Sequence, residues 1–340
     1  MRNFISKLIV LGIIIGALWM VQYQAVEAGL KHLPGQVRPM WDYQKRFVHS
    51  HTPGQHARTL VTGDSRAWFG ILPDRLGKDA VSIALPATRP LEGYYLLADY
   101  LDHHPAPERV VLSYAPTSWG AGLTGFWDQA CGFKFLSLPR CFEVLYRYHR
   151  LRHQAPMLTY DFWNDCLKSV LYAVNYFPLY RNGMLDVLFG PGFVSPSNIL
   201  TDQRLRAQSM TGGEIGKSPN LRSDDPKHLV KLQNMPSKSL QIEYFVRTLR
   251  LCESRGIQIV YMTSPVYEAV FSGMAESFKR DIKTIIETSV GSVKGVRTFY
   301  RTDIPSYPAE LFADGSHLNR EGAVRFTSEI ADLMLPELAH

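Results

Sequence analysis

The sequence contains few cysteines, and their spacing indicates no framework that could hold a fold together. Four occur in 340 residues, and their separations match neither a zinc site nor a disulfide-stapled scaffold: Cys131, Cys141, Cys166 and Cys252. In an oxidising compartment Cys131 and Cys141 could close a short loop, and the alternative is that all four are buried or unpaired thiols. A zinc finger and a small disulfide-rich fold are therefore excluded.

Internal repeats, low-complexity tracts and metal-ligand spacings are also missing. Histidines gather in HSHTPGQH (residues 49–56) and at His103 and His104, but no cysteine or carboxylate accompanies them at the spacing of metal ligands. Solvated or capping histidines are favoured there over a metal site. Hydrophobic residues make up 46% and charged residues 20% of the chain, which excludes disorder and fits one large domain or two small ones.

The chain is basic, but its charge alone does not identify a partner. A formal net charge of +6 suits nucleic acid, an anionic membrane surface or an acidic glycan. Location separates these, because Arg2 and Lys7 precede LIVLGIIIGALWMV (residues 8–21), an apolar run that approaches the length of a membrane span. By the positive-inside rule the N-terminus stays in the cytoplasm and the rest of the chain is exported, so a nucleic-acid partner is not expected.

Two interpretations of this N-terminal segment remain open. Residues 1–28 form either an uncleaved signal anchor or a signal peptide that is cut after Ala28. The anchor is favoured because Trp19, Met20 and Gln24 make a poor approach to a cleavage site. We therefore expect a single-pass protein of the cytoplasmic membrane whose main domain is extracytoplasmic, either periplasmic or at the cell surface.

Beyond the anchor, the chain alternates between strand-like and helix-like segments. Residues 29–57 are rich in Pro, Gly and His and indicate a stalk or a loop leading into the domain. Strands are then expected at residues 60–62, 81–85, 110–114, 257–265 and 296–300, and helices at residues 66–76, from Pro90, at 237–255, at 274–288 and at the C-terminus.

This alternation predicts an α/β fold. The chain from residue 58 to 340 should form a doubly wound, mostly parallel sheet, because apolar runs such as RVVLSYAP suit strands that are buried on both faces. The regular pattern stops between about residues 119 and 236, which we interpret as a large insertion after the third strand that roofs the sheet.

A serine follows the first strand in TLVTGDSRAWFG (residues 59–70). Functional groups gather at the carboxyl ends of strands in open α/β sheets, where Gly63 would permit a tight turn and Asp64 or Ser65 would cap the next helix. At such a helix start, Ser65 could be a nucleophile whose own N–H helps to stabilise an oxyanion. The alternative is that Ser65 is only an N-cap.

A base for this serine is available near the other end of the chain. Asp314 and His317 lie in the loop after the last strand, just before the final helix. An aspartate three residues before a histidine can orient the imidazole, which fixes the tautomer that accepts a serine proton.

These two blocks resemble those of a known family. GDSR (residues 63–66) is similar to the first block of the SGNH/GDSL hydrolases, and DGSHLNREGA (residues 314–323) is similar to their last block. The resemblance implies a flavodoxin-like three-layer domain with Ser65 as nucleophile, His317 as general base and acid, and Asp314 as the carboxylate that orients the histidine.

The sequence departs from the family pattern at the oxyanion hole. The Gly-x-Asn-Asp block, which supplies a side-chain amide in the family, is replaced by YAPTSWGAG (residues 114–122), where Thr117 or Ser118 could substitute. The glycine after the second strand has no clear match either, so Ala87 or Thr88 offers only a backbone N–H there. The expected donors are therefore Ser65, Thr88, Thr117 and Ser118.

The anchor, together with LPATRPLEGYYLL and TSPVY, looks like the membrane-tethered branch of this family. That branch includes the DltD-like proteins and the SGNH partners of membrane-bound O-acyltransferases, and it implies acyl transfer or ester hydrolysis on a cell-envelope glycan or acyl-carrying polymer without a cofactor. The alternative is an inactive scaffold or glycan-binding partner of a membrane O-acyltransferase. Candidate substrate-binding residues flank the two loops: Arg66, Trp68, Arg89 and Trp119. The two tryptophans could stack on a sugar ring, and the alternative, packing in the core, is favoured for both.

Overall fold

The protein is described from a computed structural model that covers residues 6–7, 9–14, 16–17, 37–50, 57–120, 126, 130, 135–152, 202–213 and 238–334. The chain divides into two compact units. One comprises Met1–Pro39, Leu123–Tyr146 and Thr159–Leu200, and the other comprises Met40–Gly122, Arg147–Leu158 and Thr201–His340. The second unit contains the sheet and both candidate loops.

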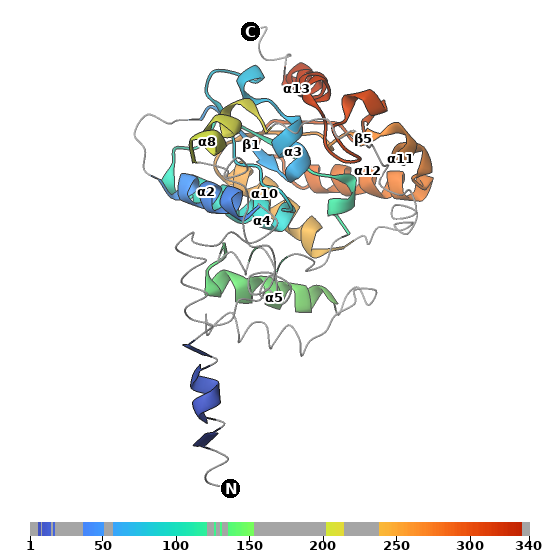
Figure 1. Ribbon diagram of the computed structural model, residues 1–340. Helices are drawn as coiled ribbons and strands as arrows, with labels where there is room; N and C mark the ends of the chain where they lie inside the picture. The colour runs from blue at the N-terminus through green and yellow to red at the C-terminus, as the bar shows by residue number, and fades with distance from the viewer. Residues whose placement is uncertain are drawn as a thin grey trace. The chain divides into compact units, whose positions relative to one another are not determined.

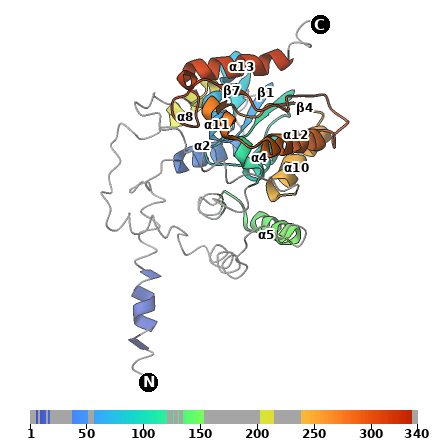
Figure 2. The ribbon, with the colours of Figure 1, turned by 90° about the vertical axis from the view of Figure 1, so that its right-hand side faces the viewer.

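A five-stranded parallel sheet forms the centre of the second unit, with the strand order β2-β1-β3-β4-β6 (Figures 1 and 2). The strands are β1 (Thr59–Gly63), β2 (Ala80–Ser82), β3 (Arg109–Ser113), β4 (Gln258–Tyr261) and β6 (Thr298–Tyr300). A separate parallel pair joins β5 (Val266–Tyr267) to β7 (Ser306–Tyr307). The expectation of an α/β fold with a parallel sheet is confirmed.

Helices cover both faces of the sheet. One face carries α4 (Pro90–His103), α10 (Leu240–Ser254) and α12 (Glu276–Val290), and the other carries α3 (Ser65–Gly70) and α13 (Arg320–Met334). Other helical segments in the described part of the chain include α2 (Arg38–His49), α5 (Leu138–Arg152), α8 (Asp202–Thr211), α11 (Glu268–Gly273) and the short 3-10 turns Pro73–Arg75, Pro116–Ser118 and Ala309–Leu311. The result is a three-layer α/β arrangement.

Local sequence explains several of these boundaries. Pro90 starts α4, where its missing N–H costs no hydrogen bond. Ser239 caps α10 by accepting a hydrogen bond from the Ile242 amide at 3.1 Å, and Gly256 follows the helix at a φ of +67° that favours glycine. In α13 the residues that face the core recur at helical spacing, and Leu333 is half-buried: Ala323, Phe326, Ile330 and Met334.

Four predicted elements are shorter than expected. The strands predicted over residues 81–85 and 296–300 form only β2 (Ala80–Ser82) and β6 (Thr298–Tyr300). The helix over residues 66–76 ends at Gly70, because Leu72 precedes Pro73 and a residue before proline disfavours the helical conformation. The strand predicted over residues 257–265 ends at Tyr261, and the chain then leaves the sheet to form β5 beside β7.

The segment predicted to be a stalk contains a packed helix. In α2 the buried residues are Met40, Trp41, Tyr43, Gln44 and Val48. The sequence did not predict this helix, because its buried face interrupts the apolar pattern with a polar residue, Gln44. The amide Nε2 of Gln44 donates to the Ser82 carbonyl at 3.1 Å. This helix belongs to the folded domain.

Other expectations fall largely on undescribed residues. Most of residues 119–236 and all of 18–36 lie outside the described part of the chain, as does Cys131, so its pairing with Cys141 is untested. Cys141 and Cys252 are buried. Among the described residues, no helix combines the length and the apolar character needed to cross a membrane.

Candidate active site

The turn after β1 is built around a close approach of two strands. Gly63 has a φ of +156°, and a Cβ atom at this position would lie 2.0 Å from the Ser113 carbonyl oxygen on β3. Only glycine fits there, since any side chain would push the two central strands apart. The turn therefore fixes where the next residues, Asp64 and Ser65, leave the sheet.

Asp64, not Ser65, is the N-cap of α3. Its Oδ1 accepts a hydrogen bond from the Arg66 amide at 2.9 Å, and its Oδ2 accepts one from the Ala115 amide at 2.7 Å. The buried carboxylate also lies 3.3 Å from the Ser118 hydroxyl, so it ties the serine turn to the loop after β3. Ser65, the first residue of the helix, is left free for another partner.

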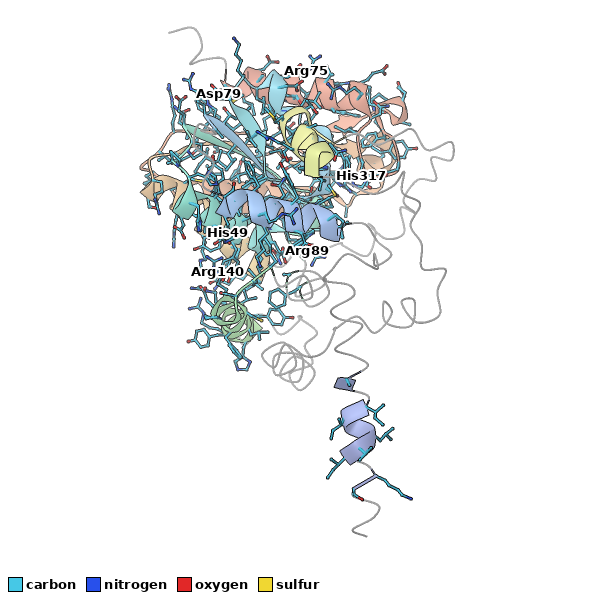
Figure 3. All side chains as sticks on the ribbon, turned by 60° about the vertical axis from the view of Figure 1, so that its left-hand side comes forward. His49, Arg75, Asp79, Arg89, Arg140 and His317 are labelled. Atoms are coloured by element: carbon cyan, nitrogen blue, oxygen red, sulfur yellow. The ribbon has the colours of Figure 1, made fainter. Side chains whose placement is uncertain are left out.

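That partner is His317. The Ser65 Oγ lies 2.9 Å from His317 Nε2, although the two residues are 252 positions apart, and His317 Nδ1 lies 2.8 Å from Asp314 Oδ2. A hydrogen-bonded chain therefore runs from the hydroxyl through the imidazole to the carboxylate; we refer to these residues as the triad. Figure 3 labels His317 among the side chains of this region.

The surroundings of Asp314 keep it ionised. Burial alone would raise the pKa of Asp314, but hydrogen bonds from the His317 ring and from the amides of Ser316 and His317 outweigh burial and hold the pKa well below its usual range. A carboxylate can only accept, so His317 Nδ1 carries the proton between them. In the neutral ring, Nε2 is then the acceptor for the Ser65 hydroxyl.

The loop that carries His317 is held at both ends. The Ala313 amide donates to the His317 carbonyl at 2.8 Å, and the Asn319 side chain accepts from the Gly322 amide at 3.1 Å at the start of α13. Phe69, on α3, places its ring edge-on against the imidazole with ring centroids 5.2 Å apart. These contacts restrict the ring orientation that the hydrogen bonds require.

Of the four residues expected to supply oxyanion donors, two already bond other protein groups. The Thr88 amide, the donor expected there, bonds the Leu85 carbonyl at 3.4 Å, and the buried Thr88 hydroxyl bonds the carbonyls of Gly63 at 3.0 Å and Leu85 at 2.7 Å. Ser118 is engaged with Asp64, and Thr117 is half-buried in the 3-10 turn after β3. The amide of Ser65 lies at the first turn of α3, where helix N–H groups have no intrahelical acceptor.

Ala87 takes a backbone conformation that favours glycine. Its φ is +60°, which makes it the one non-glycine residue with positive φ in the described part of the chain. The side chain is exposed in the loop between β2 and α4. Strand β2 lies beside β1 in the sheet. The sequence predicted only a backbone N–H here, from Ala87 or Thr88.

The two tryptophans near the candidate loops are in the core, as the favoured alternative predicted, so they are not available to contact substrate. Trp68 is 1% exposed and Trp119 is 0% exposed, and Trp119 packs edge-on against Phe245. Their apolar bulk is used for packing and not for stacking on a sugar ring. Arg66 and Arg89 are half-buried, and Arg66 donates to the Pro265 carbonyl at 3.4 Å.

A buried carboxyl group next to these loops was missed by sequence reasoning. Glu92 is 6% exposed, and its Oε2 accepts from the Arg89 amide at 2.9 Å. Burial raises the pKa of Glu92 to about 7, against the lowering effect of its backbone hydrogen bonds and of Arg89. The available signal was its place three residues after Arg89, where a glutamate reaches back to the start of a helix.

Comparison with known proteins adds no family. Neither a protein-family model nor a curated protein matches this chain. The geometry of the triad and its loops therefore carries the functional argument.

Proposed function

We propose that this protein is a membrane-anchored, extracytoplasmic serine esterase or O-acyltransferase that acts on O-acyl groups of a cell-envelope glycan or polymer. The observation that carries the proposal is the continuous hydrogen-bonded chain from Ser65 Oγ through His317 to Asp314. A serine hydroxyl, a histidine and an orienting carboxylate in this order form the arrangement that activates serine for attack on an ester.

The proposed reaction proceeds in two halves. In acylation, Ser65 Oγ attacks the ester carbonyl carbon while its proton passes to His317 Nε2, and the carbonyl π electrons move to the oxygen. When the tetrahedral intermediate collapses, the bond to the alkoxy oxygen breaks and the leaving alcohol takes the proton from Nε2. In deacylation, water or an acceptor hydroxyl gives its proton to Nε2 and attacks the acyl-serine, and Ser65 recovers a proton as it leaves.

The developing oxyanion needs donors at the same edge of the sheet. In our proposal the Ser65 amide is one donor, because the start of α3 presents N–H groups and the positive end of short aligned peptide dipoles. The Ala87 amide is the second, because a positive φ at this position matches the glycine that the family resemblance calls for. These two amides replace the side-chain amide that YAPTSWGAG lacks.

The resemblance to the SGNH/GDSL hydrolases supports the choice of an O-acyl substrate. The apolar run at residues 8–21, with Arg2 and Lys7 before it, supports placement of the domain outside the cytoplasm next to the membrane. Transfer and hydrolysis share the acyl-serine and differ only in whether an acceptor hydroxyl or water reaches it.

The test uses the full-length protein in detergent with p-nitrophenyl acetate and a fluorophosphonate probe. We expect ester cleavage and labelling in the wild type and loss of both in Ser65→Ala and His317→Ala. Ser328→Ala, an exposed serine on α13, is the matched control and should keep both. Labelling that persists in Ser65→Ala would contradict the assignment of the nucleophile.

One observation favours a second candidate, an inactive scaffold or glycan-binding partner of a membrane O-acyltransferase. The loop after β3 holds Thr117 and Ser118 where the family pattern has a side-chain amide, and Ser118 is bonded to Asp64. A folded wild type that shows neither labelling nor ester cleavage would favour this alternative.

A further inference from the structure

Helix α2 makes a specific contact with the loop between β2 and α4. Trp41 is 1% exposed, and its indole Nε1 donates a hydrogen bond of 3.0 Å to the Pro86 carbonyl, 45 positions along the chain. The sequence predicted a stalk or loop here, and neither would place an indole against a loop of the domain core.

The acceptor of this bond belongs to the same peptide unit as the Ala87 amide. A peptide bond is planar, and in the trans form its C=O and N–H point in opposite directions; the described residues contain no cis peptide. Holding the Pro86 oxygen therefore also fixes the direction in which the Ala87 N–H points. A carbonyl that accepts a hydrogen bond also makes its own peptide N–H a somewhat stronger donor.

This peptide needs support because Ala87 is strained. A non-glycine residue at a φ of +60° is strained, and it keeps this conformation only where its surroundings hold it there. The flanking residues are held on both sides: the Leu85 amide and the Thr88 hydroxyl each bond the Gly63 carbonyl at 3.0 Å, and Arg89 is bonded to Glu92. Trp41 supplies the contact for the peptide between them.

The indole is itself held by the packing of α2. Gln44, one turn after Trp41, bonds the Ser82 carbonyl on β2 at 3.1 Å and lies 3.4 Å from the Ser209 hydroxyl on α8. Val48, a further turn along, is fully buried. The helix is therefore anchored to the β2 segment independently of the contact with Pro86.

We propose that Trp41 is a positioning residue that aims the Ala87 amide at the oxyanion. This inference rests on the proposed function, since it assigns Trp41 a role in the acyl chemistry of Ser65. It makes the segment immediately before the first strand a working part of the site.

The test compares kcat and KM for p-nitrophenyl acetate in the full-length wild type, Trp41→Phe and Val48→Ala. Phenylalanine keeps an aromatic ring in the core but has no N–H donor. Removing an oxyanion donor costs about 10²–10³ in kcat, so misdirecting one should lower kcat by on the order of ten- to a hundredfold with little change in KM. Val48→Ala loosens the same helix without removing a hydrogen bond, so its kcat should stay close to the wild-type value.

The outcomes separate this inference from the proposed function. A folded Trp41→Phe protein with wild-type kcat would overturn the inference, and so would an equal loss of kcat in Val48→Ala, which would indicate a general effect of helix stability. Absence of activity and labelling in the wild type would instead contradict the proposed function, on which the inference depends.

Discussion

Replacing Glu92 with glutamine should change how stability depends on pH. Glu92 is almost fully buried at the start of α4, where its Oε2 accepts from the Arg89 amide at 2.9 Å. Glutamine has nearly the same volume and keeps an oxygen that can accept this bond, but it does not titrate. The substitution therefore removes the ionisation of one buried group and leaves the local contacts close to their original form.

The size of the effect follows from the pKa. Burial raises the pKa of Glu92 from 4.5 to about 7, so the folded protein binds this proton more tightly than the unfolded chain does. The stabilisation is present below the unfolded pKa and is lost as the pH rises toward the folded pKa. A shift of about 2.5 units corresponds to about 3 kcal/mol of unfolding free energy.

The assay is urea unfolding of wild type and Glu92→Gln at about pH 4 and about pH 8. All other groups titrate in both proteins, so the difference between their unfolding free energies isolates Glu92. We expect the variant to gain about 3 kcal/mol relative to wild type between the two pH values. Parallel stability curves would refute the argument that a charged carboxylate is buried at this position.

Two further substitutions test the triad and the serine turn. Asp314→Asn should lower kcat by on the order of 10⁴ in ester hydrolysis while the protein stays folded, because an amide favours the wrong histidine tautomer; a loss under about tenfold would contradict the role of Asp314. Gly63→Ala should lower Tm strongly or prevent folding, because its Cβ would lie 2.0 Å from the Ser113 carbonyl, and a wild-type thermal melt would contradict this close approach.

Much of the sheet could be predicted from the sequence because its strands are short apolar runs between helices. Val110, Val111 and Leu112 are fully buried in β3, as their unbroken apolar character indicated. The meeting of Ser65 with His317 follows from the same logic, since Ser65 directly follows β1 at the carboxyl edge of the sheet and His317 lies in the segment between the last sheet strand, β6, and α13.

Features that depend on distant contacts could not be predicted. The buried face of α2 includes Gln44, which is tolerated only because Ser82 on β2 accepts its hydrogen bond. The positive φ of Ala87 could not be predicted from its residue type, because alanine normally has a negative φ. Core packing was favoured for Trp68 and Trp119 and is confirmed, but the residue type alone could not decide it, since tryptophan occurs both in cores and at substrate sites.

The separation of Ser65 from His317 has a consequence for protein synthesis. A ribosome that adds roughly 5–20 residues each second needs on the order of 10–50 seconds to pass from one to the other, across 252 positions. During that interval the nascent chain contains the serine without its base, and the imidazole reaches it only when α13 has packed beside α3. A chain that stops before residue 317 would therefore carry the hydroxyl but not its base, so incomplete translation products should lack esterase activity.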